Sequence, residues 1–537
     1  MDSVQSQDHT SLHILNFPNE ILFRIFDFLR SEPVRSIAVG GAFGYRNGKD
    51  DVKNTRLVCR RFRDASSHLL ISSINVSVNK ASLAQLDEIS RHPLMSKGVR
   101  KVNVSLRFFD ASSANYFEDV YCYNQLRRLT SIISLYRTRK ESLLRTLSEA
   151  AQGLQEDINI PKVNSQLKIQ IEIVATGGRI LESWRKLTDH APDTDLDDED
   201  RANIEYLQRA HKRYRDAYLE QEQLLSDGSF AQEVANAVAR MPIAKSLFVT
   251  HESLSNRVLN ILAPETGGMP GFLVTDMATP MDWVTAHLHD ITIPTIELLV
   301  QIPLAIYRAG SMVTNVHYKL ALPPEFPFSR LIGSDQDMSE LNAAMQELKD
   351  FTFESMDIRT HLRSVPTMAE SKQIKKFVEA FTDTDSIETL YMNCSDPFHL
   401  LGSPSCSAGS LLLTRKWPRL RQVCFQGPLE PEDIKQFFAN TQGRASLDLY
   451  SNHLLSGSWT EVLDIIRDNV QRTGITSFVQ LPSGSEWEQL APEQRTAVFG
   501  GGRWHSKANL YIQGLIPENP LKGLGENNHW GMVQVLE

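Results

Sequence analysis

The residues of this chain with the clearest potential for metal chemistry lie in the tetrapeptide HLHD, which contains His287, His289 and Asp290. Imidazole and carboxylate groups are accepted Zn²⁺ ligands, and on a β-strand His287 and His289 would share one face. A closed site needs further ligands, and no supporting third ligand stands out in the sequence. The pattern therefore does not predict a metal site.

Cys406 is a candidate nucleophile, within the small-residue run GSPSCSAGS. A reactive thiolate needs a neighbouring histidine or a helix N-terminus that lowers its pKa, and the sequence cannot place either of them beside Cys406. The run is typical of a flexible surface loop. A hydrolase that pairs Cys406 with one of the 15 histidines remains an alternative from another class of protein.

Motifs of several common enzyme classes are absent from the sequence. The sequence contains no GxxxxGK[ST] phosphate loop, no HExxH zinc motif and no GxSxG nucleophile elbow. The segment GLGEN at 523–527 lacks the strand and the final glycine of a dinucleotide-binding turn. We therefore expect no catalytic residues, no cofactor and no metal.

Size and composition narrow the function classes further. A chain of 537 residues exceeds the usual size of one hydrophobic core, so two or more domains or an elongated repeat array are expected. A formal net charge of −9 and the lack of a basic stripe interleaved with aromatics argue against nucleic acid as a partner. Five scattered cysteines are typical of reduced thiols.

The N-terminal residues and the hydropathy predict an intracellular protein, cytoplasmic and/or nuclear. The first ten residues lack the basic start and apolar core of a secretory signal. The most membrane-like segment, IPTIELLVQIPLAIYRAGSMV, is interrupted by charged residues and by Pro294 and Pro303. It therefore predicts buried strands or short helices, and no membrane partner is expected.

The most apolar surface of the chain is predicted to lie on two amphipathic helices near the N-terminus. The first is LNFPNEILFRIFDFL at 15–29, where Pro18 suits a first helical turn and an apolar stripe follows at helical spacing. The second is TRLVCRRFRDASSHLL at 55–70, which is basic on its other side. Two short helices cannot bury both of their faces unaided, so they are expected to need a partner surface.

Together, these two segments resemble an F-box. The likeness lies in a Leu-Pro-x-Glu-Ile-Leu opening, with Phe17 in place of the usual Leu, an Ile-Phe-x-x-Leu continuation, and a Leu-Val-Cys-Arg-x-Phe second half. The matching residues are Pro18, Glu20, Ile21, Leu22, Ile25, Phe26, Leu29, Leu57, Val58, Cys59, Arg60 and Phe62.

What the F-box resemblance implies is a three-helix module that binds the Skp adaptor of a cullin-based SCF ubiquitin ligase, with an apolar stripe in a groove of the adaptor. The alternative is that both helices pack into this protein's own core. One departure is the connection at 30–55, roughly twice the family's usual length. It is tolerable in closure entropy but is expected to alter the docking surface, because the family's middle helix normally lies there. The residues implied to bind the adaptor are Pro18, Ile21, Leu22, Ile25, Phe26, Leu29, Leu57, Val58 and Phe62.

Apolar residues at spacing i, i+3, i+5 recur beyond the F-box, several of them just after an amphipathic helix, and they predict short strands. A helix followed by Leu-x-x-Leu-x-Leu is typical of a leucine-rich repeat, here irregular, and the later units fade because GITSFVQL places Gln480 in the third apolar slot. A non-repetitive α/β domain is the alternative. The triplets are Ile71, Ile74 and Val76; Val99, Val102 and Val104; Ala244, Leu247 and Val249; Leu348, Phe351 and Phe353; Ile387, Leu390 and Met392; and Leu420, Val423 and Phe425.

The region at about 111–240 is predicted to be a helical insertion, because two long segments, LRRLTSIISLYRTRKESLLRTLSEAAQGL and ANIEYLQRAHKRYRDAYLEQEQLL, carry apolar residues at helical spacing. Between them, DTDLDDED at 193–200 carries six carboxylates. This composition favours a solvated linker that leads into the N-terminus of the following helix. The more specific alternative is a docking surface for a basic partner.

We therefore expect a mixed α/β (α+β) chain: a disordered tail at 1–12, a three-helix F-box at 13–70, and an irregular leucine-rich-repeat-like α/β solenoid at 71–537 that recognises an unknown protein substrate. The turn RHPLMSKGVR after the first strand and helix resembles fungal F-box proteins. The implied function is that of a non-catalytic substrate-recognition subunit, with a Skp-type adaptor and a cullin as partners. An F-box scaffold that acts outside a ubiquitin ligase is the nearest alternative.

Overall fold

The computed structural model describes residues 14–29, 48–151, 160–188, 196–254, 277–288, 291–321, 328–331, 333–355, 368–393, 409, 415–484, 486–502 and 504–522. The expected tail at 1–12 lies outside these residues. Within them the chain is a mixed α/β protein built on one nine-stranded parallel sheet, so the predicted α/β class is confirmed. None of the described helices combines the length and apolar character that crossing a bilayer requires.

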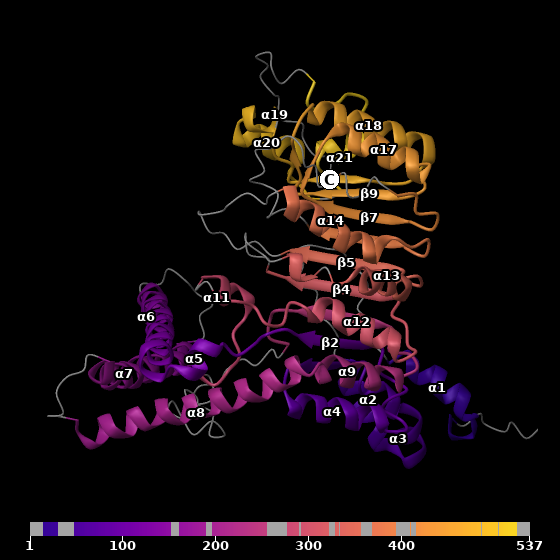
Figure 1. Cartoon of the computed structure of the whole chain (residues 1–537). Coiled ribbons are helices and arrows are strands. Elements are labelled where there is room, and N and C mark those ends of the chain that lie inside the picture. Colours follow the sequence, from indigo (N-terminus) through magenta and orange to yellow (C-terminus); the bar gives the residue numbers. More distant parts are fainter. Residues whose placement is uncertain are drawn as a thin grey trace, which may run out of the picture.

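The nine strands stand side by side in the order in which the chain makes them, and each pairs in parallel with the next. Figure 1 shows them stacked from indigo to yellow. Such sequential parallel order requires every connection to cross back over the same face of the sheet. The strands are β1 (Ser73–Ser77), β2 (Lys101–Ser105), β3 (Ser246–Thr250), β4 (Asn315–Leu320), β5 (Asp350–Ser355), β6 (Thr389–Asn393), β7 (Gln422–Gln426), β9 (Ser446–Tyr450) and β11 (Phe478–Gln480).

The apolar triplets correctly located the strands. The second and third members of each of the six predicted triplets lie in a strand and are buried in the main hydrophobic cluster. Strand β4 follows the same rule with Val313, Val316 and Tyr318, although we did not predict it from the sequence. Period-two alternation explains the pattern, since the second and fourth residues of each strand point to one face.

The register predicted for the last strand was wrong by one residue. Val479 pairs with Leu449 and Phe478 with Asp448, so Ser477 and Val479 face the core, and Gln480 does not occupy a core position. Ser477 is fully buried, and its hydroxyl accepts a hydrogen bond from the Leu447 N–H at 3.0 Å. A one-residue slip exchanges the two faces of a strand, which is why this unit appeared to lose its apolar pattern.

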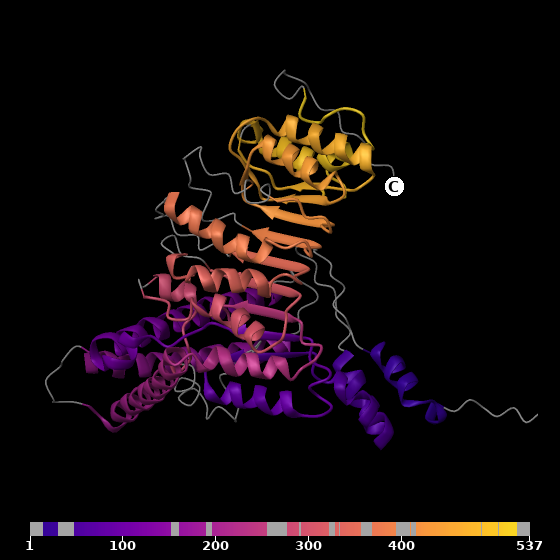
Figure 2. The same cartoon turned by 45° about the vertical axis from the view of Figure 1, so that its right-hand side comes forward.

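One face of the sheet is covered by a row of helices, as Figures 1 and 2 show. Each helix buries its apolar stripe on the strands in the same cluster as the inward strand residues. The membrane-like segment of the sequence forms the buried helix α12, as expected of a core element. The row consists of α4 (Lys80–Arg91), α9 (Ser229–Ala239), α12 (Leu298–Arg308), α13 (Asp335–Ala344), α14 (Met368–Thr382), α17 (Pro431–Thr441) and α18 (Trp459–Thr473).

A repeated backbone contact sets the stagger of each strand on the one before. The carbonyl of Ser72 accepts hydrogen bonds from two consecutive N–H groups, those of Arg100 and Lys101. Because these bonds need only backbone atoms, successive units keep the same spacing although their sequences diverge. The carbonyls that accept two such bonds are those of Ser72, Arg100, Lys245, Thr314, Lys349 and Glu388.

Between β2 and β3 the chain forms a separate helical body. Strand β2 nevertheless pairs directly with β3, Lys101 opposite Ser246. The body has its own hydrophobic cluster around Tyr121, Trp184 and Leu207, and in Figure 1 its long helices project to one side of the sheet. It consists of α5 (Ala111–Asn115), the π-helix η3 (Phe117–Cys122), α6 (Tyr123–Ala151), α7 (Ile160–Thr188) and α8 (Asp198–Ser226). Helix α8 contains the second predicted helical segment, and α6 contains the first as far as residue 151, beyond which the segment lies outside the described residues. The sequence did not single out α7.

The acidic segment before α8 serves partly as a helix cap. Asp197 is the N-cap, and its carboxylate accepts the Asp200 N–H at 2.7 Å. Asp200 is buried and forms an ion pair with Lys186 at 2.7 Å, and this hydrogen bond lowers the pKa of Asp200. Asp193 lies outside the described residues. For Asp197–Asp200, the expected role at a helix N-terminus agrees with the structure.

Shorter elements complete the chain. Strands β8 (Pro428–Leu429) and β10 (His453–Leu454) form a small parallel pair at the carboxyl ends of the neighbouring strands. Strand β11 is followed by α19 (Glu486–Gln489), α20 (Pro492–Phe499) and α21 (Lys507–Ile512). Helix α11 (Trp283–Leu288) and the 3₁₀ turn η5 (Phe328–Leu331) lie in earlier connections.

Candidate functional site

The N-terminal helices form a small body with its own core. Its elements are the 3₁₀ turn η1 (Ile14–Asn16), α1 (Asn19–Asp27), α2 (Gly48–Val58), α3 (Arg60–Ser66) and the 3₁₀ turn η2 (Ser67–Leu69). Phe26 and Phe62 meet edge to face with ring centroids 5.0 Å apart. Burial of these groups holds α1 against α3. The core residues are Leu22, Phe26, Val52, Phe62, Ala65 and Leu69.

Two residues of the Leu-Val-Cys-Arg-Arg-Phe segment organise the turn between α2 and α3. Cys59 has extended backbone angles and ends α2, while its Sγ accepts the Phe62 N–H at 3.4 Å and so caps α3. The Arg61 guanidinium donates to the carbonyls of Leu15 and Phe17 and to Asn19 Oδ1, the last at 3.0 Å. These bonds fix the chain entry to α1 against α3.

The nine residues expected to bind an adaptor divide into two groups. Leu22, Phe26 and Phe62 are buried inside the N-terminal body and cannot present a docking surface. For these three, the picture of one stripe that inserts into a partner needs correction: they pack in the body's own core because α1 turns that side towards α3. Ile25 and Leu29 are half-buried against that core, while Pro18, Ile21, Leu57 and Val58 are exposed.

Exposed apolar side chains lie on the N-terminal body in η1, on and just after α1, and at the end of α2. Leu57 is 84% exposed and Phe28 90% exposed. Single exposed apolar residues are ordinary, but several on one small body indicate an interaction surface. Those of the N-terminal body are Ile14, Leu15, Ile21, Phe23, Phe28, Leu57 and Val58.

A second candidate surface is the sheet face opposite the helices. Its central row holds one residue from each strand, paired in register, and most of these side chains are partly exposed. Such a row places polar and aromatic groups about 4.8 Å apart, strand by strand. The row reads Asn75, Asn103, Phe248, His317, Thr352, Tyr391, Cys424, Asp448 and Phe478.

Aromatic and charged groups interact along this row. Lys101 Nζ lies 4.2 Å from the centre of the Phe248 ring, and Phe248 meets His317 edge to face at 4.7 Å. His317 Nε2 lies 3.2 Å from a carboxylate oxygen of Glu354. Burial lowers the pKa of Lys101 and raises the pKa of Tyr391, so burial favours the neutral form of each side chain. The row therefore offers stacking and hydrogen-bonding groups for binding.

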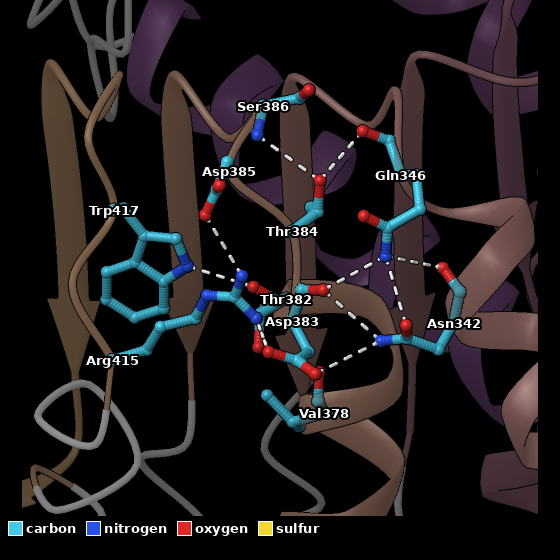
Figure 3. A network of polar contacts seen from close by, with 10 residues as sticks. All are labelled: Asn342, Gln346, Val378, Thr382, Asp383, Thr384, Asp385, Ser386, Arg415 and Trp417. Atoms are coloured by element: carbon cyan, nitrogen blue, oxygen red, sulfur yellow. Dashed lines mark hydrogen bonds and ion pairs between the residues drawn. The ribbon is translucent and has the colours of Figure 1, made fainter.

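A network of hydrogen bonds and ion pairs lies before the amino ends of β5, β6 and β7, as drawn in Figure 3. Arg415 forms ion pairs with Asp383 and with Asp385, the latter at 3.1 Å. The indole N–H of Trp417 donates to the Thr382 carbonyl at 2.9 Å, and the Asn342 amide donates to the Asp383 carbonyl at 3.2 Å. These bonds join the ends of α13 and α14 to the entry of β7, so the network stabilises the stacking of units.

The chemical candidates of the sequence do not converge on a reaction centre within the described residues. His287 lies in helix α11 and not on a strand as assumed, and His289 and Asp290 lie outside the described residues. Cys406 and the segment 523–527 lie outside them too. Across the described ranges, no group of three or more His, Cys, Asp or Glu is placed to hold a metal ion.

No family model matches this chain, and no curated protein matches it at a significant level. Two surfaces of the described residues are candidates for binding a partner. One is the apolar surface of the N-terminal helices, and the other is the polar and aromatic face of the sheet.

Proposed function

We propose that this chain is a substrate-recognition subunit of an SCF-type E3 ubiquitin ligase, in which residues 13–70 act as an F-box. The observation that carries the proposal is the exposed apolar surface of the N-terminal body, above all Leu57 at 84% exposed and Ile21 at 41% exposed. This surface lies within the segments that resemble an F-box. An apolar helix surface of this kind suits the groove of a Skp-type adaptor.

The sheet supports the second half of the proposal. Nine parallel strands in chain order, with helices packed on one face, suit an irregular leucine-rich-repeat-like solenoid over 71–537. The face opposite the helices is the proposed binding surface for a target protein, with Phe248, His317 and Tyr391 as contact residues. The chain would contribute proximity rather than chemistry, because it holds the target near the conjugating enzyme of the complex.

The test is co-purification of the full chain with its host's Skp adaptor and cullin. We expect wild type to retain both proteins and Leu57→Asp to lose them, because a charge buried in an apolar groove is costly. Leu515→Asp is the matched control, since Leu515 is 71% exposed and lies near the C-terminus. Retention of adaptor and cullin by Leu57→Asp would reject the docking surface, and retention of adaptor without cullin would favour a scaffold outside a ligase.

A further inference from the structure

A cavity of about 320 Å³ lies where the helical body meets the carboxyl end of β2. Its walls come from five parts of the chain: Arg107 after β2, Ser113 on α5, the first turns of α6, Tyr214 on α8, and the segment around Thr279 that leads into α11. Cavities of this size are at the lower end of those that hold small molecules. It is separate from both surfaces described above.

The lining of this cavity is strongly basic for an acidic protein. Three guanidinium groups, those of Arg107, Arg127 and Arg128, line it together with one carboxylate, that of Asp282. The formal charge of the lining is therefore +2, in a chain whose formal net charge is −9. Arg128 also donates to the Thr279 hydroxyl at 3.3 Å, which places its side chain on the cavity wall.

A buried amide in the cavity has unused hydrogen-bonding capacity. Gln125 is 6% exposed, and its Oε1 has no hydrogen-bond partner among the described residues. Buried polar groups are normally paired, so such an atom points to a missing ligand or water. Because the oxygen and nitrogen of an amide exchange places by rotation, Gln125 can present its NH₂ group to an anion.

A second cavity, of about 540 Å³, adjoins the first and shares Asn124 and Arg127 with it. Its walls include the aromatic rings of Phe108 and Tyr123 and two carboxylates, those of Asp110 and Glu222. The first cavity therefore suits an anionic group, and the aromatic walls of the second suit an uncharged ring.

We propose that these two cavities bind a phosphate monoester whose ester group is a ring, with the phosphate between Arg107 and Arg128 and the ring beside Tyr123. A phosphate monoester carries close to two negative charges at neutral pH, which matches the +2 of the first cavity, where the phosphate would lie. Asp110 and Glu222 line the second cavity and keep the phosphate out of it. Guanidinium groups bind phosphate oxygens through paired hydrogen bonds. The shared chemistry is an aryl phosphate, which a small molecule or a phosphorylated tyrosine side chain would supply. This site does not depend on the proposed F-box function.

The experiment is calorimetric titration of the full chain with phenyl phosphate, phenyl sulfate and inorganic phosphate. We expect phenyl phosphate to bind most tightly, because phenyl sulfate has one charge and inorganic phosphate has no ring. The affinity should fall as salt is raised, a measurement that needs no variant. No binding of phenyl phosphate, or equal affinity for phenyl sulfate, would overturn the proposal.

Variants test the residues. Arg128→Gln and Arg128→Lys should each weaken phenyl phosphate binding roughly tenfold to a hundredfold, because Lys keeps the charge and loses the paired geometry. Arg145→Gln is the matched control, as Arg145 is exposed on the same helix α6. Wild-type affinity in both Arg128 variants, with unchanged circular dichroism, would reject the site.

A phosphotyrosine peptide distinguishes the source of the ligand. Tighter binding of the peptide than of phenyl phosphate would support the site and identify a phosphorylated protein as the source. Equal or weaker binding of the peptide would support the site as one for a small molecule.

Discussion

The carbonyl oxygen of His68, at the end of the N-terminal body, lies where Gly98 would have to place a β-carbon. An ideal Cβ at position 98 would stand 1.6 Å from that oxygen. Gly98 ends the turn after α4, so the absence of a side chain lets the N-terminal body rest on the first unit of the sheet. The contact is between backbone atoms, which cannot move aside as a flexible side chain does.

Gly98→Ala should therefore destabilise the protein by about 1–3 kcal/mol, the usual cost of overpacking. The measurement is thermal unfolding followed by circular dichroism. Gly178→Ala is the matched control, because Gly178 lies within α7 and a Cβ there would meet nothing within 4 Å. This control should be neutral or stabilising by up to about 1 kcal/mol, as alanine favours a helix interior. Equal unfolding midpoints for the two variants would contradict the close contact.

Leu22→Asp and Leu57→Asp should separate stability from binding. Leu22 is fully buried in the N-terminal body, so a carboxylate there should unfold residues 14–29 and 48–70. Leu57 is 84% exposed, and its replacement should change the free energy of unfolding by less than about 0.5 kcal/mol. Hydrogen exchange of the α1 and α3 amides is the measurement. Protection lost in both variants, or in neither, would contradict this division of the apolar residues.

His251 should make the protein less stable in acid. It follows β3, is 2% exposed, and neither of its ring nitrogens has a hydrogen-bond partner among the described residues. Burial lowers the pKa of His251 below the usual value of 6.5. The effect of burial is larger than that of the charged groups around the ring. Those groups are Asp282 and Glu252, which raise the pKa, and Lys319 and Arg107, which lower it.

Proton binding by His251 determines whether acid raises or lowers the free energy of unfolding. Below pH 6.5 the unfolded chain takes up a proton on His251 that the folded chain resists, so stability is present above that pH and is lost as the pH falls, by at most about 1.4 kcal/mol per pH unit. His251→Phe should flatten the fall of the denaturation midpoint between pH 7 and pH 5. Burial also lowers the pKa of His211. His211 is present in both wild type and His251→Phe, so the difference between their pH dependences reports His251 alone. An identical pH dependence in wild type and variant would rule His251 out as a source.

Asn509 should protect the last strand of the sheet. Its amide donates to the Val479 carbonyl at 3.1 Å, and its Oδ1 accepts the Val479 N–H at 2.8 Å. Asn509→Leu leaves two buried backbone groups unpaired and should cost about 2–4 kcal/mol. It should also promote self-association through the exposed edge of β11, measured by light scattering. Asn236→Leu, on an exposed face of α9, is the control, and equal loss in both variants would argue against edge capping.

The strands were predictable because their pattern is local. Each unit repeats the same pattern: one apolar residue before the strand and two core-facing residues on it. This pattern does not depend on the spacing between units, so the same rule would also have found Val316 and Tyr318 of β4. Ser477 defeated the rule because its core position is filled by a hydroxyl that bonds to a backbone N–H. Only the neighbouring strand reveals that partner.

The division of the N-terminal apolar residues was not predictable, because both sides of α1 are apolar. Ile21 and Leu22 are adjacent and similar in type, and only the position of α3 decides that Leu22 is inside. The arginines of the basic cavity were hidden for another reason. Arg107 and Arg128 are separated by the turn of the chain into α5 and α6, and neither forms a local motif in the sequence.

The pairing of Lys101 with Ser246 has a consequence for the order of folding. Every other neighbouring pair of strands in the sheet is closer along the chain, so their contacts close shorter loops and are expected to form sooner. The β2–β3 pairing is thus the late kinetic step, at which a unit of β1, α4 and β2 joins a sheet assembled from β3 onwards.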